Sequence, residues 1–195
     1  MLAVAALCLL SCHTDKNKKI MENDPAIYAL LTRVSVRYFT TEKPSEEQIN
    51  LILRAGMAAP TAVNKQPWAF IVVDEPELLK EIGERLPNSR VQNDAQVAIV
   101  VCGDMSKALE GEVRDFWIQD ASAATENILL AVHALGLGAV WTGLIPSVER
   151  SNVAREILNV PEHLVPFCII PIGYPAEQPQ VKDKFKEENI HYNKW

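Results

Sequence analysis

Short runs of apolar residues alternate along the chain with segments in which apolar positions recur at helical spacing. Residues 69–73, 97–102 and 167–172 are continuous runs of β-prone residues, which predict three strands. Because these runs do not alternate apolar with polar positions, we expect both faces of their sheet to be covered. The pattern therefore predicts helices packed on two sides of a sheet.

Helix-start signals identify the first two expected helices. Asp24 followed by Pro25 is typical of an N-cap and a proline in the first turn. Ser45 and Gln48 have capping-box spacing, and apolar residues then recur at helical intervals until Pro60. These signals predict two helices, of which the second has one apolar face.

Residues 112–135 predict the longest helix, because they contain no proline or glycine and are rich in alanine. Gly136 is expected to close this helix as a C-terminal cap. The small side chains of residues 121–124 would let another backbone approach closely, as in a compact core or a dimer interface. Ser147 predicts the cap of a further helix that runs to about residue 158. Together these elements predict one domain with a mixed α/β or α+β fold.

The N-terminus is treated separately, because residues 2–10 form an unbroken run of apolar and small residues before Ser11 and Cys12. The run is too short to span a bilayer. Its end resembles the lipobox of bacterial lipoproteins, which implies a signal peptide at 1–11, an acylated Cys12 and a tether at 12–23. The protein would then be a membrane-anchored lipoprotein that faces the periplasm. No Lys or Arg precedes the run, and a cytoplasmic protein with a frayed N-terminus is the alternative.

The charge and the cysteine content exclude several classes of function. The 195 residues have a formal net charge of −6 and a pI of about 5.3, whereas nucleic-acid binding needs a clustered basic surface. The four cysteines are too few and too scattered for a disulfide framework. No Cys-x-x-Cys pair or histidine cluster has metal-ligand spacing, so we expect no structural metal. Cys102 and Cys168 lie in the apolar strand runs, where a thiol is usually inert.

Arg33, Ser35 and Arg37 follow the first expected helix at alternate positions. In an extended segment this spacing points the three side chains to one side. Two guanidinium groups, which offer forked donors and stay charged, together with a hydroxyl suit a phosphate. A solvated basic strand that makes surface salt bridges would have the same pattern, and taken alone these residues favour that alternative.

A proline-bounded loop follows the second expected helix and precedes the first strand. The loop contains Pro60, Thr61, Ala62 and Asn64 and ends at Trp68. Its backbone and amide groups can face a flat heterocycle while Trp68 packs the loop down. A stiff connector with a packed tryptophan is the alternative. The combination of this loop with the upstream Arg-x-Ser-x-Arg segment favours a binding site.

In this order the segments resemble the nitroreductase family of flavoproteins, and the resemblance covers residues 24–195. It implies an α+β (mixed α/β) fold with a central antiparallel-type sheet, flanking helices and a long central helix. It also implies an interlocked homodimer, in which the tail at 190–195 embraces the partner.

The resemblance further implies which residues bind FMN. The phosphate and ribityl chain are assigned to Arg33, Val34, Ser35, Arg37 and Lys184. The ring of the other subunit's FMN is assigned to the loop residues Pro60, Thr61, Ala62 and Asn64. The ring of the same subunit's FMN is assigned to Trp141, Thr142 and Gly143, and its pyrimidine edge to Asn93. Gly143 N–H would face the reactive ring nitrogen and Thr142 would orient that turn, so these two residues assist a reaction carried by the flavin.

Two late segments complete the resemblance. Gly173, Tyr174 and Pro175 match the end of the family's late strand, and Lys184 occupies a position where relatives commonly have arginine. Lysine keeps the positive charge but loses the forked geometry of arginine, so a somewhat lower phosphate affinity is expected.

The implied activity is that of an FMN-dependent oxidoreductase. Reducing equivalents from NADH or NADPH would pass to the flavin and then, by a ping-pong mechanism, to a nitroaromatic, quinone or similar small acceptor. Other flavin reactions on the same scaffold, such as dehalogenation, ene reduction or flavin breakdown, are alternatives. So are a non-catalytic flavin-binding lipoprotein and an interaction domain without flavin.

Overall fold

The computed structural model describes residues 24–195, so the predicted signal peptide at 1–11 and tether at 12–23 lie outside the described residues. The chain divides into two compact units. The described part of the first unit consists of residues 24–33 and 180–195, and the second unit consists of residues 34–179. Within the described residues, no helix has the length and the hydropathy needed to cross a membrane.

The first unit contains α2 (Pro25–Thr32) and a short 3-10 turn at Glu187–Asn189. Asp24 caps α2, since its Oδ1 accepts hydrogen bonds from the N–H groups of Ala26 and Ile27 at 3.0 and 3.1 Å. Pro25 occupies the first turn, where its missing N–H has no helical partner to lose. The predicted start of the first helix is therefore confirmed.

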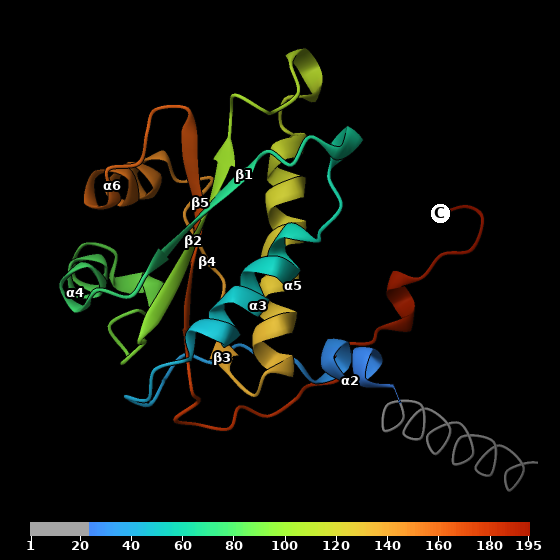
Figure 1. Cartoon of the computed structure of the whole chain (residues 1–195). Helices are drawn as coiled ribbons and strands as arrows, with labels where there is room; N and C mark the ends of the chain where they lie inside the picture. Colours follow the sequence, from blue (N-terminus) through green and yellow to red (C-terminus); the bar gives the residue numbers. More distant parts are fainter. Residues whose placement is uncertain (1–23) are drawn as a thin grey trace, which may run out of the picture. The chain divides into compact units, whose positions relative to one another are not determined.

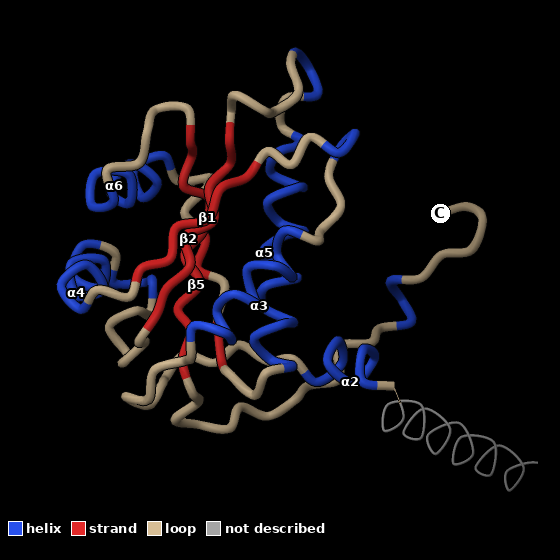
Figure 2. The backbone as a smooth tube through the Cα atoms, viewed as in Figure 1, coloured by secondary structure: helices blue, strands red, loops and turns tan. Residues whose placement is uncertain are grey.

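An antiparallel sheet of five strands forms the centre of the second unit (Figure 2). Its strands are β1 (Trp68–Val73), β2 (Val97–Asp104), β3 (Gly138–Ala139), β4 (Thr142–Gly143) and β5 (Leu164–Gly173). The strands are hydrogen-bonded in the order β1-β2-β5-β3, and β4 also pairs with β5. The three predicted strands correspond to β1, β2 and β5, of which β5 begins three residues before the predicted start at 167.

Helices cover both faces of this sheet (Figure 1). α3 (Glu46–Met57) and α5 (Phe116–Ala134) lie on one face, and α4 (Pro76–Arg85) and α6 (Val148–Leu158) lie on the other. Alternate residues of β2 point to the two faces: Ile99 and Val101 pack with α5, whereas Ala98 and Val100 pack with α4 and α6. All residues of β2 are buried, which explains why its run at residues 97–102 is continuously apolar and confirms the predicted two-sided cover.

The helix caps of the second unit are also those that the sequence predicts. The Ser45 hydroxyl accepts from Gln48 N–H at 3.2 Å, and Ser45 N–H donates to Gln48 Oε1 at 2.8 Å, so the capping box is complete. The Ser147 hydroxyl accepts from Arg150 N–H at 3.4 Å at the start of α6. α6 ends at Leu158, as predicted, because Asn159 adopts a left-handed conformation with φ 50°.

The long helix begins later than predicted, at Phe116 rather than at residue 112. Gly111 has φ +65°, and a 3-10 turn at Gly111–Val113 brings Arg114 N–H to Gly111 O at 3.2 Å. This turn changes the direction of the chain before α5 starts, although residues 112–115 include no helix breaker. The predicted C-terminal end is confirmed, since Gly136 has φ +75° just after α5.

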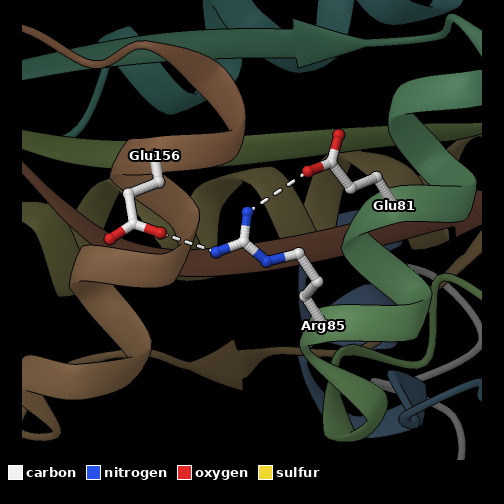
Figure 3. Close-up of polar contacts among 3 residues, drawn as sticks. All are labelled: Glu81, Arg85 and Glu156. Atoms are coloured by element: carbon white, nitrogen blue, oxygen red, sulfur yellow. Dashed lines mark hydrogen bonds and ion pairs between the residues drawn. The ribbon is translucent and has the colours of Figure 1, made fainter.

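Arg85 links the two helices that cover the same face of the sheet (Figure 3). Its Nη1 lies 3.2 Å from Glu81 Oε1 on α4, and its Nη2 lies 2.6 Å from Glu156 Oε2 on α6. The hydrogen bond that Arg85 donates to Glu156, followed by the one that it donates to Glu81, raises the pKa of Arg85 above its ordinary value. Because these three side chains are 39–65% exposed, the ion pairs contribute little to the stability of the fold.

Asp104 ends β2 with a buried carboxylate that binds the turn after the strand. Its Oδ1 accepts from Ser106 N–H at 3.0 Å and from the Ser106 hydroxyl at 2.5 Å, and Lys107 Nζ lies 3.0 Å from its Oδ2. Burial acts to raise the pKa of Asp104, but the Ser106 hydrogen bonds and the Lys107 ammonium outweigh it and hold this pKa below its ordinary value.

An acid-dependent stability is expected from this carboxylate. Because the folded-state pKa of Asp104 lies below the unfolded one, its contribution is present above the ordinary aspartate pKa and is lost as the pH falls through the folded value. Asp104→Asn should lower the free energy of unfolding by about 1 kcal/mol at neutral pH. Urea unfolding at pH 7 and near pH 3 tests this; Asp74→Asn, which removes a half-exposed ion pair with Lys43, is the control. An equal loss at both pH values would contradict the assignment.

Candidate functional site

Residues 34–40 form an extended segment that carries the predicted phosphate-binding residues of the second unit. Val36 and Phe39 are buried and pack with Ala95, and Val34 packs partly against them. Ser35 and Arg37 alternate with these valines. Ser35 is half-buried and Arg37 is exposed. Val36 is thus buried between Ser35 and Arg37, whereas Phe39, at the same parity as those two residues, is buried as well. That the Ser35 hydroxyl and the Arg37 guanidinium point to one side stays a prediction.

Asn93 fixes the backbone of this segment. Its Nδ2 donates to Arg37 O at 2.8 Å, and Phe39 N–H donates to Asn93 O at 3.1 Å. Arg37 also turns back on its own segment, with Nη1 at 3.4 Å from Ser35 O. Asn93 thus acts on the residue that carries the guanidinium; the predicted contact of Asn93 with the flavin pyrimidine stays a prediction.

Two glycines that face each other across β3 and β5 let the segment lie directly on the sheet. Gly138 is paired with Gly173 in the strand register. A Cβ on Gly138 would lie 2.7 Å from Val36 Cβ, and a Cβ on Gly173 would lie 3.1 Å from Phe39 Cβ. Val36 N–H in turn donates to Ala139 O at 2.9 Å. The missing side chains therefore make room for the segment, and the hydrogen bond holds it there.

The end of the segment pairs with the chain that leaves β5, at the Gly173-Tyr174-Pro175 match. Thr40 N–H donates to Tyr174 O at 2.8 Å, and Ala176 N–H donates to Tyr38 O at 3.0 Å. The structure thus brings together four segments that are far apart in the sequence: the basic segment, Asn93, β3 and the end of β5.

β4 places Thr142 and Gly143 against β5, opposite Ile169 and Cys168. The buried Thr142 hydroxyl donates to Ile169 O at 2.6 Å, so its interaction is with the sheet and it fixes the start of β4. The Trp141 ring contacts Phe167 edge to face, with ring centroids 5.7 Å apart. This arrangement agrees with a role for Thr142 in orienting the Gly143 turn.

The loop at residues 60–67 has an unusual backbone. Val63, Asn64 and Gln66 have φ values of 44°, 57° and 50°, in the left-handed region that non-glycine residues rarely occupy. Thr61 Oγ1 accepts from Gln66 N–H at 3.1 Å, and Asn64 Oδ1 accepts from Gln66 Nε2 at 3.1 Å. Trp68 is buried against α5, which confirms the prediction that it packs the loop down. The tip of the loop is open, since Val63 is 78% exposed.

Asp120 is a further residue of this region that the sequence reading did not identify. It lies on α5 with only 7% of its surface exposed, and its Oδ1 accepts from Ala62 N–H at 2.9 Å. A signal was present in the sequence, because Asp120 is an acidic residue directly before the small residues 121–124 of the predicted core helix.

Within one copy, loop 60–67 and segment 34–40 lie apart. The loop precedes β1, at one edge of the sheet, whereas β3 and β4 lie beyond β5, toward the other edge (Figure 1). Three strand spacings of about 4.8 Å separate these edges, or about 14 Å. Arg33 and Lys184 lie in the first unit, at the end of α2 and in the 180–195 segment.

Two surface hollows of about 590 and 510 Å³ lie elsewhere, both beside Lys43 and Asp74, the first along α4 and the second along α3. Neither is lined by a residue predicted to bind the flavin. The position of the site therefore rests on the donor groups of segment 34–40 and β4, and these groups lie outside both hollows.

The two described cysteines are unsuited to chemistry. Both are buried, and burial raises the pKa of Cys102 and that of Cys168 to about 12 each. A thiol with such a pKa is not a thiolate at neutral pH and so is a poor nucleophile. The prediction that both are inert is consistent with this.

Comparisons with known proteins identify what the chain is similar to. The model of the nitroreductase family matches residues 30–88 and 84–174. A protein of Methanothermobacter thermautotrophicus, named as an NADH dehydrogenase/NAD(P)H nitroreductase, is 48% identical over 167 residues, which cover 86% of each chain. A crystal structure from Parabacteroides distasonis with the same name is 38% identical with a TM-score of 0.83, covering 89% of this chain and all of that one. A Desulfovibrio desulfuricans protein, named as a nitroreductase in complex with FMN, is 33% identical with a TM-score of 0.72, covering 89% and 99%. These likenesses confirm the predicted α+β fold class.

Proposed function

This chain belongs to the nitroreductase family, and from this membership we propose that it is an FMN-dependent oxidoreductase that uses NADH or NADPH as electron donor. The names of its relatives, which include NAD(P)H nitroreductases and a complex with FMN, agree with the predicted activity and cofactor. The acceptor is a nitroaromatic, a quinone or a similar small molecule. The observation that carries the proposal is segment 34–40, which is fixed to the sheet and carries a half-buried Ser35 and an exposed Arg37.

The chemistry of this segment fits the phosphate of FMN. The Ser35 hydroxyl can donate one hydrogen bond, and the Arg37 guanidinium can donate two from its planar fork. Asn93 and the Val36 backbone hold the segment in place, so little conformational entropy is lost when the phosphate binds. In the proposed site, Arg33 and Lys184 supply two further positive charges.

The proposed ring site lies at β4. When bound, FMN supplies the ability to take a hydride from the nicotinamide and to pass electrons to the acceptor. The chain supplies position: Thr142 fixes β4 to β5 through Ile169 O, and Gly143 N–H is proposed to donate to the reactive ring nitrogen. Gly143 has no side chain that would keep the ring from the backbone.

We further propose that the functional protein is a homodimer in which loop 60–67 of one copy covers the flavin of the other. The separation of the loop from segment 34–40 in one copy supports this arrangement, because one flavin site then draws on both copies. Exposed apolar side chains on the α3 and α5 side of the second unit also support it: Leu51, Met57, Val63, Val113 and Phe116. The first unit adds Ile27, Tyr28, Leu30 and Leu31 of α2. Light scattering is expected to give twice the mass of one chain.

Anaerobic reduction tests the function. The purified protein should be yellow, and mixing with NADH or NADPH under argon should bleach the visible flavin absorbance. Addition of a quinone should restore the absorbance, and initial rates at several donor and acceptor concentrations should give the parallel lines of a ping-pong mechanism. A flavin that both donors leave oxidised would reject the reductase activity, and a protein that takes up no FMN would reject the cofactor.

The lipid anchor is proposed from the sequence, since Cys12 follows the lipobox-like Leu9-Leu10-Ser11. In this proposal the domain faces the periplasm on a tether of residues 12–23. Labelling of expressing cells with radioactive palmitate should mark the wild type, and Cys12→Ser should abolish the label. Cys8→Ser is the matched control and should keep it. A Cys12→Ser protein that is still labelled would disprove acylation at this residue.

A further inference from the structure

We infer that Asp120 is the positioning residue of loop 60–67: its buried carboxylate holds Ala62 N–H and so fixes the conformation in which the loop covers a flavin. This inference rests on the proposed function, because the loop is taken to cover the FMN of a second copy. Asp120 lies on the long helix α5, and none of the residues predicted to bind FMN lies on that helix.

The backbone of loop 60–67 is in a strained conformation. Val63, Asn64 and Gln66 are three non-glycine residues with left-handed φ values within a stretch of four. Such a conformation is strained for non-glycine residues, most of all for the β-branched Val63, and persists only where surrounding contacts impose it. The loop therefore needs fixed points, and an exposed tip at Val63 provides none in one copy.

Loop 60–67 has hydrogen bonds within itself and a hydrogen bond to α5. The Thr61–Gln66 and Asn64–Gln66 side-chain bonds join residues of the loop to each other, so they shape the loop without placing it. The bond from Ala62 N–H to Asp120 spans 58 positions in the sequence and ties the loop to α5. It lies immediately before Val63, the first of the left-handed residues.

Asp120 is buried on α5. Asp120 has only 7% of its surface exposed, and a carboxylate that is removed from water needs hydrogen bonds in return. The bond from Ala62 N–H to Oδ1 at 2.9 Å is a charge-assisted bond of this kind, which is stronger than a bond between neutral groups. At the same place, Ala59 and Trp68 pack on Ala124, one turn along α5, and close the base of the loop. The charge and the packing together make α5 a rigid support for the loop.

Three variants separate positioning from simple stability. Asp120→Ala removes the acceptor, whereas Asp120→Asn keeps a carbonyl oxygen that can still accept from Ala62 N–H. Ser122→Ala is the matched control, because it removes a side-chain hydrogen bond of 2.7 Å to Ile118 O within the same helix. For each holoprotein the FMN dissociation constant, the visible circular dichroism of the flavin, and kcat and KM for a quinone are measured. Hydrogen exchange of the Ala62 amide is measured in the FMN-free proteins.

Asp120→Ala is expected to speed exchange of the Ala62 amide at least about tenfold, to weaken FMN binding by about tenfold and to change the flavin dichroism. Asp120→Asn should lie between the wild type and Asp120→Ala, because it keeps the acceptor oxygen without the charge, and Ser122→Ala should stay near the wild type in all three. Wild-type exchange in Asp120→Ala would overturn the inference, as would faster exchange without any change in FMN binding or dichroism. An Asp120→Asn protein as impaired as Asp120→Ala would also overturn it. If the wild type binds no FMN, the proposed function has failed, and the exchange data then report separately whether Asp120 holds the loop.

Discussion

Replacement of both Arg33 and Arg37 by alanine is expected to leave a folded protein that no longer retains FMN. In the proposed site each arginine donates charge-assisted hydrogen bonds to the phosphate, worth about 1.5–3 kcal/mol for each arginine, so the dissociation constant should rise at least about a hundredfold. The backbone of segment 34–40 should keep its position in this variant. Its hydrogen bonds from Val36 N–H and from Asn93 do not involve the two arginine side chains, and Gly138 and Gly173 still leave room for it. FMN retained after gel filtration, read from its absorbance, measures the effect.

The expected loss of FMN depends on where the positive charges lie and on the geometry of arginine, and two controls test this. A Lys80→Ala, Arg54→Ala protein loses the same number of positive charges from the exposed surfaces of α4 and α3 and should retain FMN. Arg37→Lys keeps the charge and loses the planar fork, so its affinity should fall between the wild type and Arg37→Ala. Full flavin retention by the double alanine protein, with unchanged circular dichroism and mass, would show that the phosphate lies elsewhere.

The elements that the sequence predicted well are those set by local signals. The cap of Asp24 on α2 and the Ser45–Gln48 capping box depend on residues within four positions, so their bonds form as expected. The strand runs were equally clear, because β2 is buried on both faces. The start of α5 was missed for the opposite reason: a turn at Gly111–Val113 redirects the chain, and the composition of residues 112–115 carries no sign of it.

The candidate site was predictable in part. The alternation of Ser35 and Arg37 with Val34 and Val36 follows from the sequence once the segment is taken as extended. What holds that segment does not follow, since the bond from Asn93 Nδ2 to Arg37 O joins residues 56 positions apart. The bond from Ala62 N–H to Asp120 joins residues 58 positions apart and does not follow from the sequence either. Such contacts between distant segments arise from the topology of the sheet and not from any local pattern.

The second large effect is expected from Gly138→Ala, which tests whether the sheet positions the phosphate-binding segment. The new Cβ would lie 2.7 Å from both Val36 Cβ and Val36 Cγ1, so either β3 or Val36 must move. Val36 N–H is bound to Ala139 O, the next residue of the same strand, and the segment cannot withdraw without stretching this bond. We expect a loss of stability of about 1–3 kcal/mol from overpacking. We also expect FMN affinity to fall about tenfold, because Ser35 and Arg37 flank the displaced residue.

The two effects of Gly138→Ala can be separated by measuring FMN binding at a temperature well below the unfolding transition. Gly56→Ala is the control: its Cβ would lie 2.9 Å from Ile128 Cγ1, between α3 and α5 and away from segment 34–40. That contact is with a γ carbon of a fully buried, β-branched isoleucine, so this variant should also lose stability through overpacking, but it should bind FMN normally because segment 34–40 is not displaced. If Gly138→Ala bound FMN as tightly as Gly56→Ala while still folded, the position of Ser35 and Arg37 would not depend on the glycine at β3, and the fit of the segment to the sheet would serve stability alone.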